Sequence, residues 1–197
     1  MAVILFSCCS IAYGQAKSGL ENYNRISKEL SYSWMPVAHY QAKKGFYTEL
    51  RYNYEEVNTF SMYMGKTFLM GAKKYLSITP MLGWSAGEFK GVTLACRSAI
   101  DLNDFFVSTE AQFSQSLNTT NSSFMFSWTE AGVSFGKNFF TGLSLQTTME
   151  KDIKSIEPGF LMGFERGKLC VPVYFFNPFT SSSYFIIGIN YELSLKE

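Results

Sequence analysis

The side chains that could carry out chemistry are few in this sequence. His39 is the only histidine among the 197 residues, so a structural zinc site or an Asp/His proteolytic centre lacks the histidines it would need. Phosphate-binding loops, dinucleotide-binding glycine motifs and paired catalytic carboxylates are not visible, and we expect no cofactor. Ion pairing remains, and its clearest candidates are Arg97 and Glu110. The segments that hold these two residues decide whether their side chains meet.

Arg97 and Glu110 lie in two segments of alternating apolar and polar residues that flank an Asn-Asp pair at 103–104. Asparagine and aspartate tolerate positive φ and suit a tight hairpin turn. If Leu102 pairs with Phe105 across this turn, Arg97 lies directly opposite Glu110, so the register places opposite charges together. Each arm has about the ten residues that a tilted strand needs to cross a bilayer. We therefore expect this hairpin to form two of about twelve strands of a membrane β-barrel.

Similar segments recur at even spacing along the chain, which indicates an all-β architecture. The expected strands from Trp34 onward are 34–41, 46–54, 59–67, 75–85, 91–102, 105–116, 123–135, 139–149, 159–166, 169–177 and 184–193. One more strand at about 24–31 makes twelve, an even number as in single-chain bacterial barrels, and ten strands is the alternative. Two further hairpins follow the same pairing rule, with Glu165 opposite Cys170 and Glu130 opposite Ser144.

The connections between these segments alternate in length. Tight turns are expected at 42–45, 69–74, 103–104, 136–138 and 167–168, and longer, more polar loops at 55–58, 86–90, 117–122, 150–158 and 178–183. Short turns on one rim and longer loops on the other are typical of outer-membrane barrels. We therefore expect an antiparallel up-and-down transmembrane β-barrel with both chain ends on the short-turn rim.

The alternation places charged residues on the inner face of this barrel. The candidates that line the lumen are Glu49, Arg51, Arg97, Glu110, Glu130, Glu165 and Glu192. With Asp101 they give six carboxylates against two guanidinium groups, a balance of about −4, which predicts a narrow, acid-lined passage that favours cations. The Arg97–Glu110 pair has two interpretations, a bridge that fixes the register or a constriction that selects ions.

Two further assignments concern faces and rims. The face of His39 stays open, because the segment 34–41 does not alternate clearly. Four aromatic residues near strand ends are expected in the girdles that anchor a barrel at the membrane interfaces. They are Tyr52, Tyr54, Trp84 and Tyr184.

Composition agrees with a membrane barrel. Charged residues make up 17% of the chain, against about 25% in soluble domains, and aromatic residues also make up 17%. A lipid-facing surface accommodates this many rings. The net charge of +1 gives no basis for binding nucleic acid. No apolar run reaches the roughly eighteen residues of a spanning helix, so a membrane would be crossed by strands.

The N-terminus predicts export. Residues 1–14 are expected to be a signal peptide, because an apolar run leads into a small-x-small pattern before Gln15. A lipoprotein signal ending at Cys8 and a buried N-terminal strand of a cytosolic protein are the alternatives. Residues 15–33 then form an N-terminal segment that can contain the first strand, and residues 34–197 form the barrel.

Two cysteines remain after signal cleavage. The alternation directs Cys96 toward lipid and Cys170 toward the lumen, on strands well separated around the barrel. Such a pair cannot reach disulfide geometry, so both are predicted to be free thiols.

The chain resembles the small bacterial outer-membrane β-barrel proteins over residues 34–193. The resemblance rests on the alternation, the asymmetry of the turns and segments such as FYTELRYNYE, GFLMGFERGK and YFIIGINYEL. It implies the bacterial outer membrane as location, and membrane lipids and small solutes or ions as partners. Some barrels of this kind are lipid hydrolases that use a histidine with a serine two residues on, but Gln41 stands at that place after His39. No enzyme activity is expected.

These observations predict a small passive pore or a structural membrane protein. A surface-binding or secretion and assembly component without channel activity is the first alternative. A soluble ligand-binding barrel or a lipid-modifying enzyme is the second. The sequence gives no oligomeric state.

Overall fold

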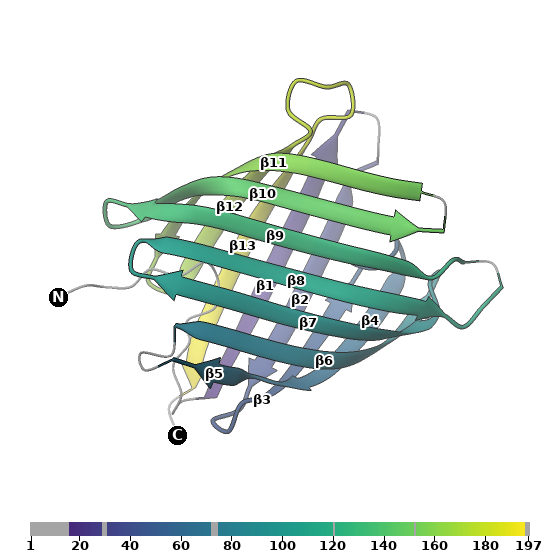
Figure 1. Cartoon of the computed structure of the whole chain (residues 1–197), viewed down its shortest axis with the longest axis horizontal. Coiled ribbons are helices and arrows are strands. Elements are labelled where there is room, and N and C mark those ends of the chain that lie inside the picture. The colour runs from purple at the N-terminus through teal and green to yellow at the C-terminus, as the bar shows by residue number, and fades with distance from the viewer. Residues whose placement is uncertain (1–15, 29–30, 72–74, 120, 152, 196–197) are drawn as a thin grey trace.

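The protein, described in this computed structural model over residues 16–28, 31–71, 75–119, 121–151 and 153–195, is one closed antiparallel β-barrel (Figure 1). None of these residues belongs to a helix long and apolar enough to cross a membrane. The expected signal peptide at 1–14 lies outside the described residues.

The strands follow one another around the barrel in chain order. They are β1 (Ala16–Ser27), β2 (Ser33–Gln41), β3 (Phe46–Tyr52), β4 (Thr59–Lys66), β5 (Phe68–Met70), β6 (Leu76–Gly87), β7 (Gly91–Leu102), β8 (Phe105–Ser116), β9 (Phe124–Phe135), β10 (Phe139–Glu150), β11 (Ile153–Arg166), β12 (Leu169–Phe176) and β13 (Tyr184–Leu195). Both β4 and β5 pair with β6, so they are two parts of one strand interrupted at Thr67. The barrel therefore has the twelve strands that the sequence predicts, and the ten-strand alternative is excluded.

Closure comes from the pairing of the first strand with the last. β1 and β13 pair along their whole length, from Ala16 opposite Leu195 to Ser27 opposite Tyr184. A closed barrel leaves no unpaired sheet edge, which is the condition for crossing a membrane with strands.

The predicted hairpin registers are confirmed. Leu102 pairs with Phe105 and Arg97 with Glu110 across the turn at 103–104, where Asn103 has a positive φ of 58°. Glu165 lies opposite Cys170, and Glu130 opposite Ser144.

The two faces of the wall differ as a membrane barrel requires. Leu94, on the outer face of β7, is 61% exposed, whereas its neighbour Thr93 on the inner face is 2% exposed. Large apolar side chains such as Leu82, Leu143 and Met162 are likewise exposed on the outside. A soluble ligand-binding barrel would hold these side chains inside, so that alternative does not fit. The outer surface is suited to lipid.

The largest errors in the predicted boundaries concern the first strand and β11. The first strand covers Ala16–Ser27, not about 24–31. Its outward face carries Asn22 and Asn24 among apolar residues, which hides the alternation. Likewise β11 begins at Ile153, so most of the long loop expected at 150–158 belongs to a strand. The first part of β11 pairs with β10 alone, and such an edge tolerates Pro158 within the strand.

The expected rims are otherwise present. The tight hairpins β7–β8 and β9–β10 lie together on the left in Figure 1, and the longer β8–β9 loop lies on the right. The start of β1 and the end of β13 lie beside the turn at 42–45, because Lys17 pairs with both Gln41 and Ser194. The described chain thus begins and ends on the short-turn rim. Cys96 and Cys170 are both free, as predicted.

Candidate functional site

Three hollows lined by described residues follow one another along the interior of the barrel. An outer vestibule of about 400 Å³ lies beneath the longer loops, a central hollow of about 100 Å³ follows, and an inner hollow of about 40 Å³ lies near the short turns. Tyr54 and Trp128 border both the outer vestibule and the central hollow. Arg97 borders both the central and the inner hollow.

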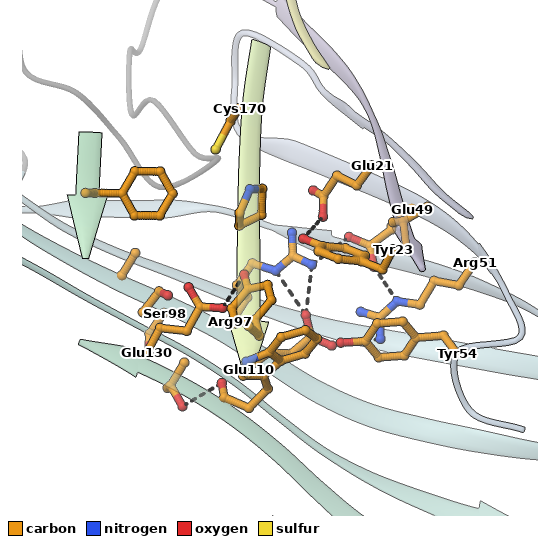
Figure 2. Close-up of a pocket in the computed structure, with 18 residues that line it drawn as sticks. Glu21, Tyr23, Glu49, Arg51, Tyr54, Arg97, Ser98, Glu110, Glu130 and Cys170 are labelled. Carbon is orange, nitrogen blue, oxygen red and sulfur yellow. Dashed lines mark hydrogen bonds and ion pairs between the residues drawn. The ribbon is translucent and has the colours of Figure 1, made fainter. Parts of the chain in front are cut away.

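Four of the seven predicted lumen residues meet in one charged cluster beside the central hollow, made of Glu49, Arg51, Arg97 and Glu110. Arg51 contacts Glu49 through Nε, and its Nη1 lies 2.7 Å from Glu110 Oε1. Arg97 Nη2 lies 2.8 Å from Glu110 Oε2 and 3.1 Å from Glu49 Oε2. Figure 2 shows the two bonds from Arg97 to Glu110. Each guanidinium is therefore shared by Glu49 and Glu110, and Arg51 Nη1 also lies 3.5 Å from Glu55 Oε1.

Tyrosine rings hold the charged cluster in place. The guanidinium of Arg51 lies between two rings, 4.4 Å from the centre of Tyr54 and 4.2 Å from the centre of Tyr63. On the other side, Tyr47 donates a hydrogen bond to Glu49 and accepts one of 2.9 Å from Arg97. Because Arg51 is 1% exposed, these contacts replace water around its charge.

Sequence reasoning missed the loop between β3 and β4 as part of this site. Asn53 has a positive φ of 57°, which turns the chain inward, so Tyr54 lies in the lumen. Its assignment to an aromatic girdle is wrong, because the alternation of β3 stops at Tyr52. The next residue, Glu55, accepts hydrogen bonds from Tyr63, at 2.6 Å, and from Ser61. Burial raises the pKa of the Tyr54 phenol well above its usual value, and the negative charge of Glu110 raises it further. The ring therefore stays neutral.

His39 faces the interior, which answers the question left open by the sequence. Its Nδ1 lies 3.3 Å from Glu21 Oε1, and its ring stacks on Tyr47 at 6.0 Å between centres. A β-carbon on Gly19 would lie 2.3 Å from the imidazole, so only glycine leaves room for this ring. Glu21, which the sequence did not single out, also accepts a 2.8 Å hydrogen bond from Tyr23.

The other three predicted residues lie apart from the charged cluster. Glu130 borders the far side of the central hollow and accepts a 2.8 Å hydrogen bond from Tyr174. Glu192 pairs with Lys17 at 3.1 Å in the inner hollow. Glu165 lies near the short-turn end of β11, opposite Cys170.

The rest of the interior is not lined by acidic residues alone, as the predicted acid-lined passage would require. An aromatic wall covers the inner faces of β8 to β13 and consists of Phe106, Trp128, Phe140, Leu161, Cys170, Tyr174, Phe176, Tyr184 and Ile186. Tyr184 is 2% exposed within it, so its assignment to a girdle is also wrong, whereas Trp84 faces outward as expected. The rings can be buried because their polar tips are bonded, for example Trp128 Nε1 to Ser144 at 2.8 Å.

The arrangement suits ion binding and passage better than bond-breaking chemistry. Over the described ranges, no group of three or more histidine, cysteine or acidic side chains could hold a metal ion. The charged cluster instead places fixed charges of both signs beside a narrow hollow, which sets the electrostatic potential that a passing ion meets.

Comparison with known proteins gives similarity in structure alone. No protein-family model and no curated protein matches the sequence. Among solved structures, the chain is similar to the KdgM porin, with a TM-score of 0.68 and 12% identity over 88% of this chain and 98% of that one. The KdgM porin in complex with disordered oligogalacturonate gives a TM-score of 0.65 and 10% identity, with the same coverage. The NanC porin gives 0.61 and 7% identity over 91% of this chain and all of that one.

At these identities the likeness shows the fold. The chain has the twelve-stranded barrel fold of bacterial outer-membrane porins, so the resemblance to small outer-membrane barrels is confirmed.

Proposed function

We propose that the protein is a passive outer-membrane pore for small solutes or ions, with a weak preference for cations. The observation that carries this proposal is the row of three hollows through a closed barrel, which shares lining residues from one hollow to the next. The porin fold of its structural neighbours supports it. Eight-stranded barrels are filled by side chains and those of about sixteen hold open channels, so twelve strands suit a narrow passage.

The charges along this passage support the cation preference. In the outer vestibule, four carboxylates (Glu55, Glu56, Glu150 and Glu157) accompany the guanidinium of Arg25. In the central hollow, four carboxylates (Glu21, Glu49, Glu110 and Glu130) accompany two guanidinium groups. The balance reverses only in the inner hollow, where Lys17 and Arg97 accompany Glu192. A cation arriving from the longer loops therefore meets an attractive potential before it reaches the inner hollow.

The solute class is expected to differ from that of the neighbour solved with oligogalacturonate. That ligand is an acidic oligosaccharide bound to the KdgM porin. In this chain, carboxylates outnumber guanidinium groups in both the vestibule and the central hollow. A polyanion would be repelled there, so we expect it to pass poorly.

Reversal potentials in planar bilayers under a salt gradient test the proposal. Folded protein, identified by a heat-dependent shift in gel migration, should give reproducible single-channel currents with a weak cation preference. Anion preference would show that positive charges, and not the carboxylates of the vestibule and the central hollow, determine the selectivity. Absence of current together with a co-purifying partner would favour the alternative, a surface-binding or assembly component.

A further inference from the structure

We propose that the ring of Tyr54 is the constriction of this barrel and determines which solutes pass from the outer vestibule to the central hollow. This inference rests on the proposed pore function and adds the residue that sets its selectivity. Tyr54 borders both spaces, and its neighbours hold it from both sides of the lumen.

The backbone of the β3–β4 loop directs Tyr54 inward. Asn53 and Asn58 both have positive φ, 57° and 55°, at the two ends of the loop. The side chain of Asn53 accepts a 2.7 Å hydrogen bond from Asn58 N and donates one of 3.0 Å to Trp34 O on β2. Asn53 N donates to Thr59 O at 2.9 Å. These bonds fix both ends of the loop, so its inward path is built into the fold.

The ring of Tyr54 reaches across the lumen. Its edge meets Phe126 on β9 at 6.2 Å between ring centres and an angle of 89°. Going around the barrel from β3 to β9, one passes β4/β5, β6, β7 and β8 in one direction and β2, β1, β13, β12, β11 and β10 in the other. The two rings therefore come from nearly opposite walls. Figure 2 shows Tyr54 pointing from its loop toward Glu110, into the central hollow.

The neighbours of Tyr54 hold the ring firmly. The guanidinium of Arg51 lies 4.4 Å from its centre, and Glu55, the next residue, is bonded to Ser61 and Tyr63. Among the residues that the structure describes, none forms a hydrogen bond with the Tyr54 hydroxyl. The ring and its position, not the hydroxyl, separate the two spaces. This difference provides a matched control, because phenylalanine keeps the ring and removes only the hydroxyl.

The first test is conductance to organic cations of increasing size, measured as the permeability of tetramethylammonium relative to potassium. Tyr54→Ala should raise the single-channel conductance about twofold and raise the relative permeability of tetramethylammonium, because pore diameter limits passage. Tyr54→Phe should match the native protein. Phe126→Ala opens the same contact from the opposite wall and should act in the same direction as Tyr54→Ala. Unchanged conductance in both alanine variants would overturn the proposal.

A second readout does not require current. Cys170 is a buried free thiol beside the central hollow, and Cys96 on the outer face can be replaced by serine. A trimethylammonium methanethiosulfonate reagent should reach Cys170 from the roomier vestibule, because the inner hollow is small and bordered by Lys17 and Arg97. Labelling in detergent, followed by mass spectrometry of the Cys170 peptide, should be several-fold faster in Tyr54→Ala than in Tyr54→Phe.

The two readouts separate this inference from the proposed function. Faster labelling in a barrel that carries no current would support the constriction and count against the pore. Current in the native protein with an unchanged labelling rate in Tyr54→Ala would support the pore and overturn the constriction. Each variant is compared only after its heat-dependent migration shows a folded barrel.

Discussion

The charged cluster and the aromatic wall border the same central hollow, yet they hold their polar atoms differently. In the charged cluster, Glu110 contacts Arg51 at 2.7 Å and Arg97 at 2.8 Å, so each charge depends on two others. In the aromatic wall, the polar atoms are the tips of rings, and they bond to polar side chains without a shared counter-charge, as Tyr174 does to Glu130. The rest of each ring is packed against other rings, for example Trp128 and Tyr174 at 5.0 Å between centres.

The difference indicates that the charged cluster and the aromatic wall have separate roles within one lumen. Removing one member of the charged cluster leaves the others buried without compensation, so its contributions are strongly coupled. Removing a ring from the aromatic wall loses apolar contact and leaves a cavity, but it leaves the charges unchanged. We therefore expect the charged cluster to control both stability and selectivity, and the aromatic wall to control stability alone.

Among the substitutions considered, Arg51→Ala should lower the free energy of unfolding the most. The change leaves Glu49 and Glu110 buried beside each other with only Arg97 as a counter-charge. Breaking a buried ionic network in this way costs about 3–5 kcal/mol. Urea unfolding in detergent or lipid vesicles measures the loss, and Arg166→Ala at the exposed end of β11 is the control. Equal stability of the two variants would show that water fills the cluster and screens its charges.

Trp128→Ala should have the next largest effect. It removes a ring packed against Tyr23, Tyr174 and Phe176 and should lower the free energy of unfolding by about 3 kcal/mol. Since no charge changes, the reversal potential under a salt gradient should stay as in the native protein. A shifted reversal potential would mean that the aromatic wall also positions the charges. The expectation that the aromatic wall controls stability alone would then be wrong.

The sequence predicts the wall of the barrel better than its contents. Period-two alternation and turn residues fix which side chains pair, as with Arg97 and Glu110. A shift of the register by one residue would move every side chain of the strand to the other face. The same alternation assigns a residue to the inner face without saying what it meets there. Arg51 and Arg97 come from strands that are far apart in sequence, and their shared carboxylates follow only from barrel closure.

The aromatic wall and the inward loop escaped prediction for separate physical reasons. Inward rings such as Trp128 and Phe176 look like lipid-facing residues in composition, even though alternation places Trp128 on the same face as Glu130. Alternation gives the face but not the partner, which for Trp128 Nε1 is Ser144. Tyr54 lies two residues after the end of β3, and the positive φ of Asn53 between them reverses the face that alternation would give. Asparagine in a polar loop is a weak signal of such a turn, because the same residue is common in ordinary loops.

Glu110→Gln tests the charged cluster with a smaller change. Glutamine keeps the shape and one acceptor oxygen, but it removes the charge that Arg51 and Arg97 share. The expected loss of stability is about 1–3 kcal/mol, because Arg51 and Arg97 lose a shared counter-charge but both keep Glu49. The cation preference should fall, because the central hollow loses one of its four carboxylates. An unchanged reversal potential would place the selective region elsewhere, in the outer vestibule.

Glu130→Gln makes the same substitution beside the aromatic wall and should have the smallest effect on stability. No guanidinium within 4 Å is paired with Glu130 in the described structure, and its contact with Tyr174 is a hydrogen bond that an amide oxygen can also accept. The free energy of unfolding should therefore change by less than about 0.5 kcal/mol, the range of substitutions that break no network. Urea unfolding of the Glu130→Gln and Glu110→Gln variants side by side makes the comparison direct, since residue type and substitution are identical and only the surroundings differ. If Glu130→Gln lowers stability as much as Glu110→Gln does, the two sides of the hollow are electrically coupled, and the lumen must be treated as a single network.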